Sequence, residues 1–169
     1  QTPIVVYGHF NKLRKFGVED YYPEVKQCVT IVRNPLELTI SRYFFIKKNI
    51  EFMHPSQVPK EDTLEEFLQN CDINMLNHFP REMNMTNYKE IIEEYFIDIG
   101  ITEYLDESMK RIANKLGFEY NSDMLGYLNV TKRDQEISAE AKETFVKKHE
   151  LEFAVYNYAL ERHIQQRTL

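Results

Sequence analysis

The stretch Cys28-Val29-Thr30-Ile31-Val32-Arg33-Asn34-Pro35-Leu36-Glu37 decides the fold of this chain of 169 residues. Its first half is apolar and β-branched, which predicts a buried strand over residues 28–32. Asn34 is a good N-cap, Pro35 fits the first helical position, and Glu37 lies where a capping box needs an acid, so a helix is predicted to begin at once. Arg33 is therefore expected at the carboxyl end of a strand, beside a helix N-terminus.

This strand–helix corner suits an anion, because backbone N–H groups and the helix dipole favour negative charge there. The Arg33 guanidinium adds a permanently charged donor with two prongs, which matches phosphate. Ser41 lies about two turns into the helix, near the face of Asn34 and Glu37, so its hydroxyl can point back toward the corner. An ordinary connection with a surface arginine has the same local pattern, so both interpretations stay open here.

Composition bounds the class of protein. The chain is 43% hydrophobic and 13% aromatic, which fits one globular domain with a real core. Its net charge of -6 argues against a general nucleic-acid binder, since such proteins are usually basic. No apolar run approaches the roughly 20 residues of a membrane span. Cys28 and Cys71 form no disulfide framework and share no metal-ligand spacing with the five histidines, so no metal is predicted.

Predicted strands alternate with predicted helices along the chain. Strands are predicted over residues 3–7, 27–33 and 95–99, and helices over 11–16, 35–49, 63–69, 88–94, 104–116 and 138–165, the last with a break near 148–150. This order favours an α/β fold with a small parallel sheet flanked by helices and a helix-rich C-terminal half. Ligands of such sheets bind at the carboxyl ends of strands. If the first two strands are parallel neighbours, His9 and Arg33 share one edge.

Three blocks of the sequence resemble those of a known enzyme family. Val32-Arg33-Asn34-Pro35-Leu36-Glu37, with Ser41 and Tyr43-Phe44-Phe45, resembles the 3′-phosphate motif of sulfotransferases. Residues 7–18 before it, residues 88–103 after it and the last helix, 150–163, resemble the heparan sulfate 2-O-sulfotransferase and uronyl 2-O-sulfotransferase group, in the same order. The resemblance implies a P-loop-NTPase-like sulfotransferase fold. It also implies transfer of a sulfuryl group from 3′-phosphoadenosine 5′-phosphosulfate (PAPS) to a hydroxyl.

The resemblance implies roles for individual residues. Arg33 and Ser41 match the pair that holds the 3′-phosphate, and Asn129 lies in the loop that in relatives approaches the nucleotide. His9 matches the second histidine of an H-G-H element and would be the general base, whereas Tyr7 has replaced the first. A neutral histidine can accept the hydroxyl proton as the S–O bond forms. Without the resemblance, a structural histidine at a strand end is the simpler interpretation.

The family also needs a loop around the 5′-phosphosulfate that carries Lys or Arg with Gly, Ser and Thr. None of the five glycines of this chain lies in such a loop. We therefore expect residues 1–169 to form a single sulfotransferase-like domain whose first strand, loop and helix lie before Gln1. On this expectation the chain holds the 3′-phosphate side of the donor and is inactive by itself.

The acceptor and the compartment are less defined. Acidic residues outnumber basic ones by 27 to 21, which favours a glycan or a small hydroxylated acceptor over a long sulfated polymer. Relatives of this group act in the Golgi lumen, whereas a bacterial protein would be cytoplasmic. Two other functions stay open: another phosphate-binding transferase that uses the same corner, and a non-catalytic nucleotide- or glycan-binding protein on the same scaffold.

Overall fold

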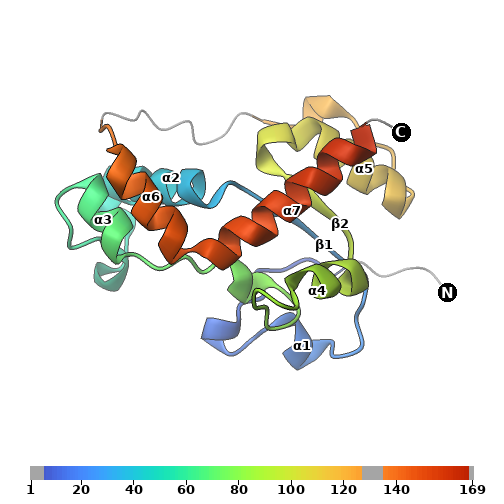
Figure 1. Cartoon of the computed structure of the whole chain (residues 1–169). Helices are drawn as coiled ribbons and strands as arrows, with labels where there is room; N and C mark the ends of the chain where they lie inside the picture. The colour runs from blue at the N-terminus through green and yellow to red at the C-terminus, as the bar shows by residue number, and fades with distance from the viewer. Residues whose placement is uncertain (1–5, 127–134, 168–169) are drawn as a thin grey trace.

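The protein has an α/β structure that is mostly helical, and the computed structural model describes residues 6–126 and 135–167 of it (Figure 1). The strands are β1 (Cys28–Val32) and β2 (Phe96–Ile101). The α-helices are α1 (Val18–Tyr21), α2 (Pro35–Lys48), α3 (Leu64–Asn70), α4 (Tyr88–Tyr95), α5 (Leu105–Leu116), α6 (Ala139–Lys148) and α7 (Glu150–Arg167). Short 3₁₀ turns are η1 (Lys12–Arg14), η2 (Ile50–Phe52), η3 (Pro55–Gln57), η4 (Met75–His78), η5 (Thr102–Tyr104) and η6 (Ser122–Met124).

The two strands are parallel neighbours, with Val32 opposite Ile101 at their carboxyl ends. Parallel strands need a long crossover connection, and here it contains α2, α3 and α4. The Thr102 hydroxyl donates a hydrogen bond to the Val32 carbonyl over 3.0 Å, just beyond the last pair of the ladder. The ends of both strands are therefore held at one edge of the sheet.

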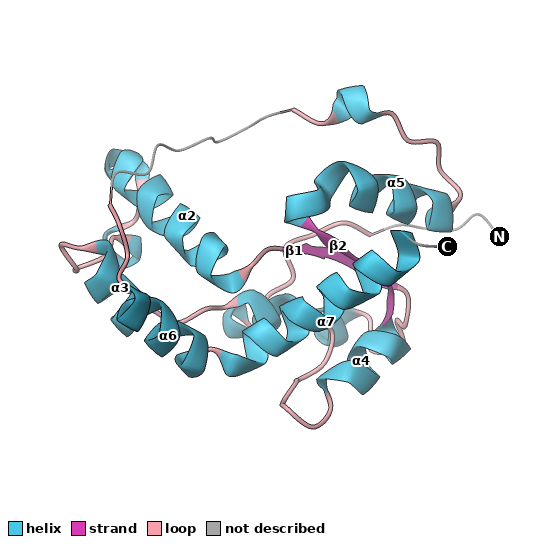
Figure 2. Cartoon of the chain, turned by 45° about the horizontal axis from the view of Figure 1, so that its top comes forward, coloured by secondary structure: helices cyan, strands magenta, loops and turns pink. Residues whose placement is uncertain are grey.

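Helices α5 and α7 cover opposite faces of β2 (Figure 2). Ile99 and Ile101 point into a core cluster that includes Val155 and Ala159 of α7. Gly100, between them, faces α5, and a Cβ atom at this position would lie only 3.1 Å from the Ser108 Cβ atom. Successive residues of a strand point to opposite faces, so Ile99 and Ile101 face α7 whereas Gly100 faces α5. Because Gly100 has no side chain, α5 can pack directly on the strand backbone.

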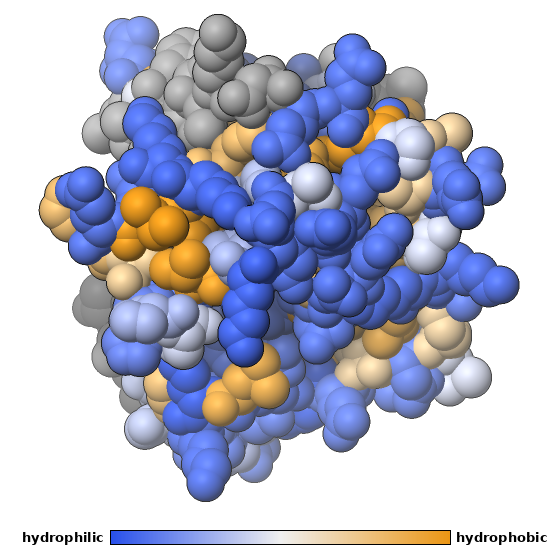
Figure 3. All heavy atoms as spheres, turned by 90° about the vertical axis from the view of Figure 1, so that its left-hand side faces the viewer, coloured by the Kyte–Doolittle hydropathy of each residue, from blue (hydrophilic) through white to orange (hydrophobic). Residues whose placement is uncertain are grey.

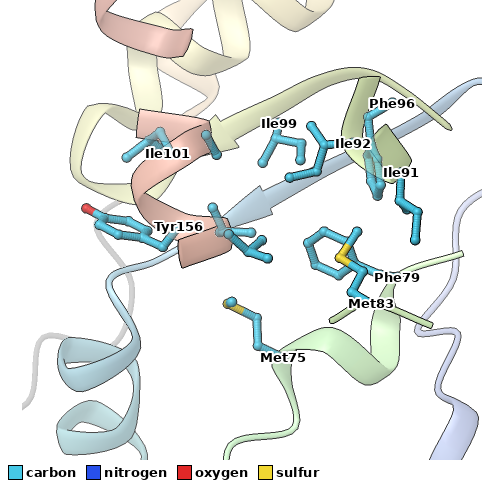
Figure 4. Close-up of a cluster of buried hydrophobic side chains, with 12 residues drawn as sticks. Met75, Phe79, Met83, Ile91, Ile92, Phe96, Ile99, Ile101 and Tyr156 are labelled. Atoms are coloured by element: carbon cyan, nitrogen blue, oxygen red, sulfur yellow. The ribbon is translucent and has the colours of Figure 1, made fainter. Parts of the chain in front are cut away.

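Buried apolar side chains form two clusters. The larger one lies between the sheet, α4, α7 and the segment around η4 (Figure 4); its buried members are Val32, Met75, Phe79, Met83, Ile91, Ile92, Phe96, Ile99, Ile101, Val155, Tyr156 and Ala159. The smaller one joins α2, α3 and α6 through Ile40, Tyr43, Phe44, Leu64, Phe67, Leu68 and Phe145. Helix α2 therefore begins at the sheet edge and continues into the second cluster.

The surface at the α2–α3–α6 end is mostly hydrophilic, with separate hydrophobic areas (Figure 3). Exposed apolar side chains of α2 and the turn that follows it are Phe45, Ile50 and Phe52. Within residues 6–126 and 135–167, no helix combines the length and the apolar character that crossing a membrane would need.

Sequence reasoning located most of this architecture. The α/β class, the small parallel sheet and the high helix content are confirmed. So is the break before α7, which falls at His149. The first predicted strand is different, because Val6 and Tyr7 lie outside any strand and residues 3–5 lie outside the described part. Helix α1, a single turn, was not predicted.

Candidate functional site

The candidate site is the corner at the carboxyl ends of the strands, where α2 begins. Asn34 caps this helix as predicted: its side-chain oxygen accepts hydrogen bonds from the backbone N–H groups of Leu36 (3.1 Å) and Glu37 (3.2 Å). The Leu38 N–H donates to the Asn34 carbonyl, and Pro35 has no N–H to offer. The first turn of α2 therefore satisfies its own donors, except for the N–H of Asn34 itself.

Arg33 follows the last residue of β1, and about a third of its side chain is exposed. Its guanidinium Nη2 lies 3.8 Å from a carboxylate oxygen of Glu37, one turn further along the chain. A partly exposed ion pair of this kind contributes only about 0–1 kcal/mol. The guanidinium can therefore exchange Glu37 for a better acceptor at small cost.

Ser41 is half-buried on α2, seven residues after the N-cap and so close to the same helical face as Asn34. Its hydroxyl forms no hydrogen bond with any of the described residues. Seven residues are close to two full turns, so the helix places Ser41 near the face on which its N-cap lies.

Glu103 brings a carboxylate into this corner, which the sequence did not predict. Its Oε1 accepts the hydrogen bond of the Asn34 N–H over 3.0 Å, and it lies in η5, directly after β2. The Tyr156 hydroxyl also interacts with Glu103: burial, together with the negative charge and hydrogen bonding of this carboxylate, raises the pKa of Tyr156 to about 12. Figure 4 shows that this hydroxyl points away from the apolar cluster that holds the ring.

The electrostatic balance of the corner differs from the expectation of an electropositive site. The Arg33 guanidinium pairs with the carboxylate of Glu37, and a second carboxylate, that of Glu103, binds the neighbouring Asn34 N–H. The helix dipole and the Asn34 N–H still favour an anion here. In the structure, however, a side chain of the protein supplies that anion.

His9, the predicted general base, lies on an exposed segment outside any strand. Its ring contacts that of Tyr7 edge to face, with centroids 6.1 Å apart. The residues that follow dock on η4, because His78 Nδ1 donates to the Phe10 carbonyl over 2.6 Å and His78 Nε2 lies 3.4 Å from the Asn11 amide nitrogen. No hydrogen bond joins His9 to Arg33 among the described residues. Asn129 lies outside the described residues.

A second polar cluster lies beneath α5, against the middle of β2. Asp98 is 4% exposed and accepts two hydrogen bonds from Arg111, from Nε over 2.7 Å and from Nη2 over 3.1 Å. Lys115 Nζ lies 3.0 Å from the same carboxylate. Burial alone would raise the pKa of Asp98, but the hydrogen bonds and charges of Arg111 and Lys115 outweigh it and lower the pKa. Asp98 is therefore a buried, paired anion.

The same network reaches α7 and a surface pocket. Arg111 also forms a hydrogen bond with Nδ1 of His163, a residue that is 1% exposed and whose ring stacks on that of Tyr104 at 5.0 Å. A pocket of about 290 Å³ lies above it, between α5 and α7, lined by Lys110, Arg111, Lys115 and His163 among others. Arg111 and Lys115 direct their charges inward to Asp98, so this cluster fastens α5 to the sheet and, through His163, to α7.

The described residues contain no group of three or more His, Cys, Asp or Glu side chains placed to hold a metal ion.

Comparisons of the chain with protein-family models, with curated proteins and with solved structures found no match.

Proposed function

We propose that this protein is a PAPS-dependent sulfotransferase that transfers a sulfuryl group to a hydroxyl of a carbohydrate or of a small acceptor. The observation that carries the proposal is the corner in which Arg33 follows the end of β1 and Asn34 caps α2, with Ser41 about two turns along the helix near the face of its N-cap. Arg33 and Ser41 carry hydrogen-bond donors, and they are the residues that the resemblance to sulfotransferases assigns to the 3′-phosphate.

The residue types fit the phosphate of the donor. A guanidinium can donate two parallel hydrogen bonds to phosphate oxygens. The Ser41 hydroxyl has no competing partner among the described residues, and the Asn34 N–H lies at the positive end of the α2 dipole. Glu37 and Glu103 work against this fit, because both bring negative charge to the place that the phosphate would take.

His9 is proposed as the general base that removes the proton of the acceptor hydroxyl as the new S–O bond forms. Its exposed position lets an acceptor approach it directly. General-base help of this kind contributes about 10²- to 10⁴-fold to a rate. In a preparation that transfers sulfate, His9→Ala should therefore lower kcat by at least about 100-fold. A variant that keeps its rate would remove His9 from the mechanism.

Binding of the desulfated product, 3′-phosphoadenosine 5′-phosphate (PAP), tests the site more directly. Calorimetry should show binding of PAP in preference to ATP, which lacks a 3′-phosphate. Arg33→Lys loses the two-pronged contact, so we expect affinity to fall by about 10-fold or more. Arg42→Lys is the matched control, since Arg42 is exposed on the same helix. Equal affinity for PAP and ATP, or equal losses in the two variants, would refute the proposal.

A non-catalytic binding protein on the same scaffold is the second candidate. The observation that favours it is that His9 lies on an exposed segment outside any strand, so that no strand of the described part holds the proposed base at the sheet edge beside Arg33. A protein that binds PAP with dependence on Arg33, yet transfers no sulfate whatever the residue at position 9, would support this alternative. Another phosphate-binding transferase is favoured instead if ATP binds as well as PAP.

A further inference from the structure

We infer that Glu103 is an internal competitor for the anion at the α2 N-terminus, a carboxylate that has to leave the corner before a phosphate can enter. This inference rests on the function proposed above and concerns the regulation of the same site. It makes ligand binding an exchange of one anion for another.

The start of α2 offers few backbone N–H groups to a ligand. The N-cap side chain of Asn34 already takes the N–H groups of Leu36 and Glu37. The N–H of Asn34 is the remaining backbone donor at the start of α2, and Glu103 occupies it at 3.0 Å. A phosphate that needs this N–H therefore meets Glu103 first.

Glu103 is held in the corner by two partners from different helices. Asn34 holds it from the start of α2, and the Tyr156 hydroxyl interacts with it from α7. The Tyr156 ring is 5% exposed and belongs to the larger core cluster, so this partner is fixed in place. Glu103 itself is exposed. Its side chain can therefore turn into solvent without disturbing the core.

The negative charge of Glu103 excludes a second anion from the same donor. A phosphate and a carboxylate cannot share one N–H donor, because like charges at hydrogen-bonding distance repel each other strongly. The corner therefore has a closed state, with Glu103 bound, and an open state, with Glu103 in solvent. The apparent affinity for a phosphate is reduced in proportion to the fraction of molecules that are open.

Titration with inorganic phosphate and with PAP tests this inference, with the backbone amide signals of Asn34 and of residues 36–38 followed by NMR. Glu103→Gln keeps the shape of the side chain and removes its charge, so both ligands should bind about 3- to 10-fold more tightly than to the wild type. Tyr156→Phe removes one holder of the carboxylate and should act in the same direction, by a smaller factor. Glu161→Gln, an exposed position on α7, changes the net charge equally and should change neither affinity.

The outcomes separate this inference from the proposed function. If phosphate binds more tightly to Glu103→Gln but PAP binds to neither protein, the competition is supported and the sulfotransferase proposal fails. If PAP binds equally to wild type, Glu103→Gln and Tyr156→Phe, the competition is overturned and the proposal survives. If neither anion binds to any of the proteins, both are overturned.

Discussion

Replacing Asp98 by Asn should destabilise the protein, because its carboxylate is the shared counter-charge of Arg111 and Lys115. The carboxylate accepts two hydrogen bonds from Arg111 and contacts Lys115, while it is only 4% exposed. An amide of the same size cannot neutralise two cations. The variant therefore leaves the Arg111 guanidinium, whose side chain is 16% exposed, without its counter-charge.

The expected loss in the free energy of unfolding depends on how deeply each partner of Asp98 is buried. Removing one partner of a buried ion pair costs about 3–5 kcal/mol, because the other charge stays desolvated. Lys115 is about a third exposed and can turn to solvent, which reduces its share. Arg111 keeps its bonds to the Ile99 carbonyl and to His163. We therefore expect the lower end of that range, about 3 kcal/mol of the 5–15 kcal/mol typical of a domain.

Urea unfolding followed by circular dichroism measures this loss, with Asp123→Asn, an exposed position in η6, as the matched control. The pKa of Asp98 is lowered in the folded state, so its charge stabilises the protein above the unfolded-state pKa near 3.8. The advantage of the wild type should be full at pH 7 and shrink as the pH falls below about 4. A loss below about 1 kcal/mol, or one that does not change with pH, would refute this account of the network.

Three further changes test other parts of the structure. Burial lowers the pKa of His149, so the unfolded chain takes up the proton first and stability should fall as the pH drops below about 6.5. His149→Gln should remove this part of the pH dependence of the free energy of unfolding, as measured by urea unfolding between pH 7.5 and 5.5. Asn34→Ala removes the N-cap of α2 and should cost about 1 kcal/mol in the same assay, whereas Asn34→Asp should restore most of it. Gly117 ends α5 with φ at 76° and no atom near the position of an added Cβ, so Gly117→Ala should lower the free energy of unfolding by about 1–2 kcal/mol through backbone strain alone.

The parts of the fold that the sequence predicted have local causes. Asn34 and Pro35 define the start of α2 within two positions, since a cap acceptor followed by a residue without N–H suits a helix N-terminus. Gly117 marks the end of α5 because it takes the left-handed conformation. Each of these signals acts over a few residues, so no knowledge of the tertiary structure was needed to interpret it.

Glu103 could not be located in the corner by such signals, because it is 69 residues away from its partner Asn34. Its position follows from the strand register: with Val32 opposite Ile101, the residues after the two strands meet at one edge. Asp98 gave one usable signal, as the charged residue inside the apolar run Phe96–Ile101. Its partner Arg111 lies 13 residues further on in a helix, and His163 lies another 52 residues beyond, so only the packing of α5 and α7 on β2 brings them together.

The contact between Glu103 and Asn34 also balances the charge of the corner. A helix N-terminus at a sheet edge leaves a positive dipole end that water or an anion has to satisfy. Glu103 supplies that anion in the structure, with Tyr156 behind it. On the proposal that this corner binds a phosphate, the electrostatic attraction that holds Glu103 weakens the binding of an external phosphate. Such a site would favour a ligand that brings more charge than a carboxylate and a second contact, at Arg33 or Ser41, over a simple monoanion.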